Sequence, residues 1–316
     1  MASKIVIVLC FALFAAAMIC SEEELEDDPQ SSVKREVKCK PPNYGFANHN
    51  RLGFACATFE LLLNLSPFVE WLRVSEPGEG FVTKAILEIY DQMSKQIVDV
   101  ELLKSRIKLI HFAGFESGDH EGNACLFLSD VIDTIDEEME GIHQILGGVI
   151  RVIENCSSCG NFTQNLHKNT MYPIHLDSNS TSVQQGIDEY NMVQFITCDK
   201  CLKELMIIQS IEHAPNVLIL KIEDLFGSPN IDLFVEFGGA KYDLHGLVLK
   251  DRQHYQTIAK SGPYWFQYND SSVRSIKLGQ LICNDSIKSK LYMCAYVRVT
   301  PENNNMTEKP PPVLKK

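Results

Sequence analysis

Two Cys-x-x-Cys pairs in the middle of the 316-residue chain constrain its fold more than any other feature. Cys156 and Cys159 form the first pair, and Cys198 and Cys201 form the second. Four thiolates at this spacing are the ligand set of a tetrahedral structural zinc site. Two disulfides are the alternative interpretation. If zinc is bound, two turns that lie far apart in the sequence must meet in space.

The first twenty residues predict export. Lys4 precedes an uncharged apolar run from Ile5 to Ile19, and an acidic cluster follows. This is the pattern of a secretory signal peptide, and the run is short for a membrane span. A short membrane anchor is the alternative. We expect residues 1–20 to be removed and the mature protein to be secreted, or held in the secretory lumen, without a membrane span.

The composition favours one large folded domain. The chain is 45% hydrophobic, which is enough for a sizeable core. Its formal net charge of −12 leaves no basic face to neutralise phosphates, so we do not expect a nucleic-acid partner. We expect a monomer in which residues 21–44 form an acidic and polar linker and residues 299–316 form a disordered tail.

Six Asn-x-Ser/Thr sequences fit an exported glycoprotein. They begin at Asn64, Asn161, Asn179, Asn269, Asn284 and Asn305. Asn64 falls in a predicted buried helix, whereas Asn161, Asn179 and Asn305 have loop-like surroundings.

One cysteine is left over when the others are paired. Removal of Cys10 and Cys20 with the signal peptide leaves nine of eleven, an odd number. Cys56 is the candidate for a reactive thiol, because it follows Gly53 and begins an apolar run that predicts a buried helix. The helix dipole would lower the pKa of such a thiol. A small buried core cysteine is the alternative. The others remain as bridges or buried thiols: Cys39, Cys125, Cys283 and Cys294.

A predicted hairpin near the C-terminus carries a histidine. Strands at 254–258 and 264–268 flank a Gly-Pro turn, and this register brings Asn269 or Asp270 back beside the His254 ring. A histidine oriented by an amide or carboxylate is the general-base half of a nucleophilic site. An ordinary hydrogen-bonded pair is the alternative.

The remaining pattern indicates an α+β protein with a helical first half and an antiparallel, β-rich second half. Apolar periodicity predicts helices at 81–93, 98–110 and 124–139. Alternation predicts strands at 217–222, 233–237, 242–249 and 293–299, in addition to the hairpin.

Several segments, in this order, resemble the ubiquitin-specific protease family of cysteine deubiquitinases. Leu52–Cys56 looks like the family's cysteine box, and Ala124–Ile135 looks like its Gln-Gln-Asp-Ala-x-Glu-Phe-Leu helix. The further matches are Ile142–Gly148 before the first Cys pair, Ala214–Leu220, Tyr242–Val248, His254–Tyr255, Trp265, Asn269–Ser272 and Ala295–Val297.

The resemblance implies a papain-like cysteine protease fold with fingers, palm and thumb over residues 45–298, and zinc-binding fingers at about 150–210. It implies that Cys56 is the nucleophile, His254 the general base, Asn269 its orienting partner and Asp270 an assisting residue. The implied reaction is hydrolysis after the C-terminal glycine of ubiquitin or a ubiquitin-like protein. A degenerate protein that binds ubiquitin or another protein without turnover is the alternative.

The departures from the family pattern concern activity and recognition more than fold. The family's oxyanion asparagine is replaced by Arg51, with Asn50 one place earlier, and loss of one oxyanion donor costs about 10²–10³ in rate. Asn123 and Leu126 stand where acidic residues hold the arginine-rich tail of ubiquitin. Glu60 falls within a segment after the cysteine that also differs from the family.

Overall fold

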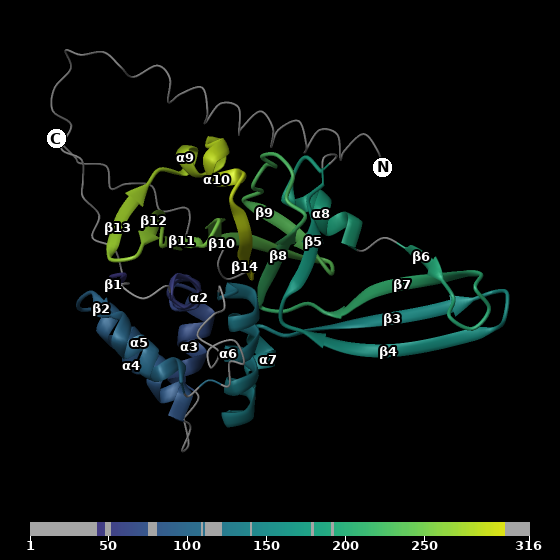
Figure 1. Ribbon diagram of the computed structural model, residues 1–316, viewed down its shortest axis with the longest axis horizontal. Helices are drawn as coiled ribbons and strands as arrows, with labels where there is room; N and C mark the ends of the chain where they lie inside the picture. Colours follow the sequence, from purple (N-terminus) through teal and green to yellow (C-terminus); the bar gives the residue numbers. More distant parts are fainter. Residues whose placement is uncertain are drawn as a thin grey trace, which may run out of the picture.

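The computed structural model describes residues 43–47, 52–74, 81–108, 110, 122–139, 141–177, 180–190 and 193–300. The predicted signal peptide, most of the linker and most of the C-terminal tail lie outside these residues. So do Asn50, Arg51, Cys39, Asn179 and Asn305. The described part forms a helical region, a large sheet and a second, elongated sheet, which we call the thumb, palm and fingers (Figure 1).

The thumb contains the helices of the first half of the chain. They are α2 (Gly53–Leu62), α3 (Ser66–Val74), α4 (Phe81–Met93), α5 (Val100–Ile107), α6 (Ala124–Glu138) and α7 (Ile142–Ile145). The short strands β1 (Phe46–Ala47) and β2 (Val98–Asp99) pair in parallel beside them. The predicted helix 81–93 is confirmed. The prediction for 98–110 is wrong at its start, because Asp99 caps α5 by accepting a hydrogen bond from Glu101 N at 2.8 Å.

The palm is an eight-stranded sheet with the order β13-β12-β11-β10-β14-β8-β5, and β9 pairs with β10. Its strands are β5 (Tyr172–His175), β8 (Val217–Glu223), β9 (Phe234–Phe237), β10 (Ala240–Asp251), β11 (His254–Ser261), β12 (Tyr264–Asn269), β13 (Ser272–Ile276) and β14 (Leu291–Arg298). All pairings are antiparallel except that of β5 with β8. The predicted α+β class and β-rich second half are therefore confirmed.

The fingers are a four-stranded antiparallel sheet with the order β4-β3-β7-β6. The strands are β3 (Gly148–Cys156), β4 (Asn161–Asn169), β6 (Gln194–Thr197) and β7 (Glu204–His213). Figure 1 shows this sheet projecting away from the thumb and palm, with the β3–β4 and β6–β7 turns at its far end. The three small helices α8 (Val183–Tyr190), α9 (Leu278–Cys283) and α10 (Asp285–Lys288) lie outside it.

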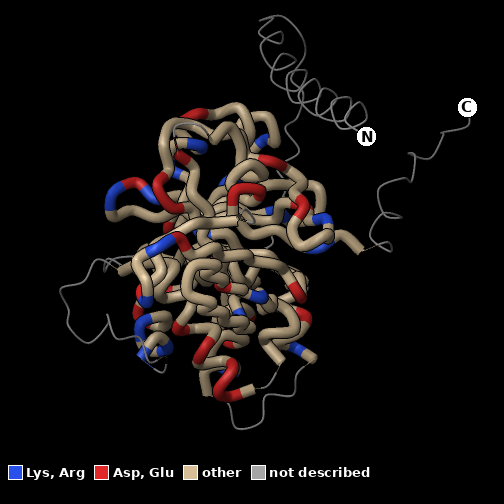
Figure 2. Tube along the Cα trace, turned by 90° about the vertical axis from the view of Figure 1, so that its right-hand side faces the viewer, with Lys and Arg blue, Asp and Glu red and all other residues tan. Residues whose placement is uncertain are grey.

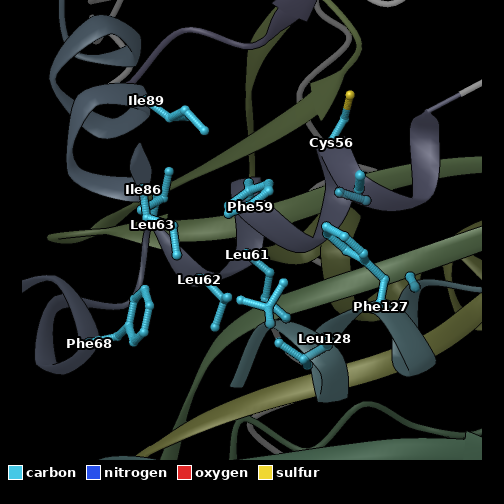
Figure 3. Packing of buried hydrophobic residues seen from close by; sticks show 14 of the residues in the cluster. Cys56, Phe59, Leu61, Leu62, Leu63, Phe68, Ile86, Ile89, Phe127 and Leu128 are labelled. Carbon is cyan, nitrogen blue, oxygen red and sulfur yellow. The ribbon is translucent and has the colours of Figure 1, made fainter. Parts of the chain in front are cut away.

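Helix α2 occupies the centre of the thumb core. From Phe54 to Leu62 every residue is buried, so the helix has no solvent face, as expected for a helix that is apolar nearly all round. Phe127 of α6 contacts both Phe54 and Phe59 edge-on, with ring centroids 5.4 Å and 5.8 Å apart. Figure 3 shows Phe59 and Phe127 within this core. Acidic and basic residues are interspersed along the chain around this core (Figure 2).

Replacing Phe127 with alanine tests this core. Phe127 is completely buried, and truncation of a buried phenylalanine costs about 3–5 kcal/mol of unfolding free energy. Chemical denaturation should show a loss in this range. The neighbouring Leu126 is 61% exposed, so Leu126→Ala should change stability by less than about 0.5 kcal/mol. Equal losses in the two variants would contradict the described packing.

Candidate functional site

Helix α2 positions the predicted nucleophile. The helix begins at Gly53 without a side-chain cap, and the amides of Ala55 and Cys56 both donate to Leu52 O at 3.0 Å. Cys56 is 2% exposed. Figure 3 shows its sulfur pointing away from Leu61 and Phe127, so the thiol lies at the edge of the apolar cluster.

The environment of Cys56 raises its pKa rather than lowering it. Burial is the largest cause, the carboxylates of Glu60 and Asp270 add to it, and a backbone hydrogen bond opposes it. The sequence-based expectation of a lowered pKa was therefore wrong. It counted the helix dipole but not the loss of water around the sulfur, which outweighs it. These surroundings favour the protonated form of the thiol.

The predicted histidine hairpin is present. Strands β11 and β12 pair through Ser261 and Tyr264, and Gly262 between them has φ +55°, as the first position of a type II′ turn requires. His254 Nε2 lies 2.8 Å from Asn269 Oδ1. Because an amide oxygen only accepts, Nε2 carries the proton and Nδ1 of the neutral ring is free to accept one.

Asp270 holds a different position from Asn269. It has φ +52° in the β12–β13 turn, and its carbonyl oxygen accepts a hydrogen bond from Phe46 N at 3.1 Å. A side chain on Gly45 would lie 2.0 Å from the same carbonyl oxygen, so only glycine permits this approach. The side chain of Asn269, one of the two predicted partners of His254, lies against the ring.

Helix α2 and strand β11 are joined by a buried hydrogen bond. Thr257 Oγ1 donates to Ala57 O at 3.0 Å. Ala57 follows Cys56 directly, and Thr257 lies three residues after His254 on the same strand, so this bond joins the two elements that carry the predicted catalytic residues. Among the contacts of the described residues, none joins the Cys56 thiol to the His254 ring. Catalytic hydrogen bonds are often long in substrate-free proteins and tighten when substrate binds.

Two tyrosine hydroxyls bind the palm to the start of α6. Tyr255 donates to Gly122 O at 3.1 Å, and Tyr292 donates to Asn123 Oδ1 at 2.7 Å. The same oxygen caps α6 by accepting from the amides of Cys125 and Leu126. Asn123, which stands where an acidic residue was expected, therefore has its side-chain oxygen fully engaged. Sequence reasoning missed Tyr292, because nothing local to it signals a contact with a residue so far away.

The two Cys-x-x-Cys pairs meet at the far end of the fingers. The four sulfur atoms all lie within 4.8 Å of one another, with Cys156 and Cys201 at 3.5 Å and Cys159 and Cys198 at 3.8 Å. Four sulfurs bound to zinc at about 2.3 Å would be about 3.8 Å apart, whereas disulfide sulfurs are about 2.0 Å apart. All four cysteines are free. The set fits a tetrahedral structural zinc ion better than it fits two disulfides.

At two of the predicted glycosylation sequences, the asparagine side chain bonds residues that connect thumb and palm or belong to the candidate site. Asn64 Nδ2 donates to Glu60 O at 2.7 Å, and Asn64 Oδ1 accepts from Tyr268 and Asn43. The Asn269 side chain bonds His254. A glycan at either asparagine would displace these contacts, so the folded protein disfavours both sites.

The fold is that of the ubiquitin-specific proteases. The SAGA DUB module Ubp8/Sgf11/Sus1/Sgf73 bound to monoubiquitin matches 91% of this chain and 76% of its own, with a TM-score of 0.65 and 17% identity. A yeast SAGA DUB module with a mutant Sgf73 covers 88% of this chain and 74% of its own, with a TM-score of 0.67 and 15% identity. The predicted thumb, palm and fingers are therefore confirmed.

The sequence comparison agrees with the structural one. Ubiquitin carboxyl-terminal hydrolase 19 of Arabidopsis thaliana is 23% identical over 203 residues, which are 54% of this chain. The chain spans 30% of the length of that relative. No family model matches the sequence. Among the described helices, none is both long and apolar enough to cross a membrane.

Removal of one zinc ligand should release the metal. We expect about one zinc per purified chain by elemental analysis, and essentially none in Cys159→Ser, because a structural site needs all four ligands. Cys294→Ser is the control, since Cys294 is a free cysteine in the palm core. Wild-type protein that is folded, metal-free and lacks four reactive thiols would contradict the site.

Proposed function

We propose that the chain is a thiol-dependent isopeptidase that hydrolyses the bond after the C-terminal glycine of ubiquitin or a ubiquitin-like protein. The observation that carries the proposal is the pairing of His254 Nε2 with Asn269 Oδ1 at 2.8 Å, beside the helix that bears Cys56. A histidine held in this tautomer presents its other nitrogen as a base. The proposal is also supported by the fold, which is similar to that of a DUB module bound to monoubiquitin.

In the proposed reaction, Cys56 Sγ attacks the carbonyl carbon of the terminal glycine while its proton passes to His254 Nδ1. The tetrahedral intermediate collapses, and the departing lysine amine takes that proton from the imidazole. Water then attacks the thioester, with the imidazole again acting as base. Asn269 keeps the ring oriented throughout, and Asp270 is the assisting residue.

The raised pKa of Cys56 sets a requirement for this mechanism. The thiol must lose its proton during attack, or the bound substrate must change its surroundings. The predicted oxyanion donors Arg51 and Asn50 lie outside the described residues, so the donor is not part of the proposal. The zinc ion, when bound, would fix the two finger turns to each other.

The fingers offer a surface for the protein substrate. Exposed apolar side chains stand on β4 and β6, the two outer strands, and include Phe162, Leu166 and Phe195. Apolar residues clustered on an exposed sheet are typical of a protein-binding surface. We propose that these side chains contact ubiquitin or a ubiquitin-like protein. We also propose that the chain acts as a monomer.

A binding protein without turnover is the second candidate. Two observations favour it: the pKa of Cys56 is raised, and Asn123 and the exposed Leu126 replace the expected acidic residues. An uncharged amide cannot form the ion pair with an arginine-rich tail that a carboxylate would form. Under this candidate, Cys56→Ala would bind ubiquitin and produce its biological effect unchanged.

We also propose that the mature protein is exported. The apolar run near the N-terminus supports this, and so does Cys283, which is disulfide-bonded, because disulfides persist in oxidising compartments. Protein recovered from the medium of expressing cells should lack residues 1–20 by N-terminal sequencing. Recovery only from the cell interior with residues 1–20 intact would contradict export.

The test of activity is reaction with ubiquitin that carries a thiol-reactive electrophile at its C-terminus. We expect a covalent adduct with the zinc-loaded protein and none with Cys56→Ser. His254→Ala should slow the adduct by at least about 10²-fold, because general-base catalysis contributes about 10²–10⁴. A folded, zinc-loaded protein that forms no adduct would rule out the ubiquitin-directed enzyme.

A further inference from the structure

A cavity of about 860 Å³ lies on the palm between strands β12 and β13 and the small helices α9 and α10. Figure 1 shows both helices on the side of these strands away from helix α2. The cavity is lined by none of the predicted catalytic residues Cys56, His254 and Asn269. Its volume is typical of a small-molecule site, so it is a candidate for a second binding site on this chain.

The cavity is basic although the chain is acidic. Asp and Glu outnumber Lys and Arg by 41 to 29, yet none of the described residues that line the cavity is acidic. Its cations are Arg274, Lys277 and Lys290. Lys290 pairs with Asp251 at 2.8 Å, whereas no ion pair of the described residues involves Arg274 or Lys277. A cavity lined by charges of one sign attracts the opposite charge, so it favours an anion.

A buried amide holds the guanidinium of Arg274 in place. Gln267 of β12 stands opposite Arg274 of β13 and is 8% exposed. Its Oε1 atom accepts from Arg274 Nε at 3.1 Å and from Nη2 at 2.8 Å. Because the amide oxygen is neutral, it orients the guanidinium without cancelling its charge. The guanidinium has further N–H donors that this contact does not use.

The same amide orients a second donor. Gln267 Nε2 donates to Gln256 Oε1 on β11 at 2.7 Å. Gln256 also lines the cavity, and with its oxygen engaged it offers its amide nitrogen, which can only donate. Arg274, Lys277 and Gln256 therefore present hydrogen-bond donors to one cavity, which suits a ligand rich in acceptor oxygens.

Two aromatic side chains add an apolar part to the lining. Trp265 is 5% exposed and belongs to the palm core with Leu281 of α9 and Ile287 of α10. Tyr264 is 50% exposed. An organic group attached to the anion could bury apolar surface against these rings.

We propose that this cavity binds a small organic phosphate, with the phosphate group at Arg274, Lys277 and Gln256 and the organic part against Tyr264 and Trp265. A phosphate monoester carries about −1.5 to −2 charge at neutral pH and three strong acceptor oxygens, which suits two cations and an amide donor. A carboxylate offers a smaller charge and fewer oxygens. The inference does not rest on the proposed function.

The two tryptophans of the chain allow the cavity to be monitored with an internal control. Trp265 lines the cavity, whereas Trp71 stacks on Phe68 in the thumb. Fluorine NMR of protein labelled with 5-fluorotryptophan gives one signal for each, and Trp71→Phe assigns them. The probe is phenyl phosphate, and the comparison compounds are inorganic phosphate, benzoate and the uncharged benzyl alcohol.

We expect phenyl phosphate to shift the Trp265 signal saturably and to leave the Trp71 signal in place. Arg274→Gln and Lys277→Gln should each weaken binding at least about tenfold, the effect of losing one charge-assisted hydrogen bond. Lys241→Gln is the matched control and should bind like wild type, because Lys241 is an exposed lysine of β10 outside the cavity. Inorganic phosphate, benzoate and benzyl alcohol should all bind more weakly than phenyl phosphate.

An unmoved Trp265 signal would overturn the inference, as would equal affinities in wild type, Arg274→Gln and Lys277→Gln. Benzoate that binds as tightly as phenyl phosphate would overturn the assignment to phosphate, and benzyl alcohol that does so would overturn the preference for an anion. Melting temperatures close to that of wild type establish that the variants are folded. Neither ubiquitin nor Cys56 takes part in these measurements, so their outcome is separate from that of the proposed function.

Discussion

The contact between helix α2 and strand β11 is the interaction on which the rest of this structure depends. The helix is buried on every side, so its position is fixed by the palm as much as by the thumb. Thr257 of β11 donates to Ala57 O across this contact, and beside it Tyr268 of β12 donates to Asn64, which follows the helix. A shift of the helix would leave these groups unpaired, which costs about 1–3 kcal/mol for each.

This contact decides the chemical state of the site. It brings Cys56 close to the hairpin of His254 and Asn269, and it also removes the water that would stabilise a thiolate. Burial and the neighbouring acids raise the pKa of the thiol and favour its protonated form. Under the proposed function, His254 is the oriented base, Cys56 is the nucleophile, and substrate brings the two groups together.

The parts of the fold that were predictable from sequence are those with local signals. The Cys-x-x-Cys spacing predicted that the two turns meet, and the alternating apolar residues on either side of a Gly-Pro turn predicted the hairpin. Apolar residues at helical spacing predicted α4. The start of α5 was missed because Val98 pairs with the distant Phe46. Tertiary pairing of this kind overrides local periodicity.

The candidate site could be predicted only in part, because some of its features depend on contacts between distant segments. The register of the hairpin was enough to place Asn269 beside His254. The burial of Cys56 and Glu60 and the engagement of Asn123 by Tyr292 depend on contacts from other elements. Glu60 is visible in the sequence as the single charged residue of a segment that is otherwise uncharged. Its burial could not be predicted, because the strand that covers the helix lies far away in the sequence.

The proposed function requires the Cys56 thiol and the free nitrogen of His254 to approach each other on this fold. A short bifunctional reagent, 1,3-dibromoacetone, tests it directly because it can alkylate both groups and displaces one bromide at each. We predict a single cross-linked pair of peptides that joins Cys56 to His254 and is absent in His254→Ala. Alkylation of Cys56 by the reagent without any link to His254 would contradict the account.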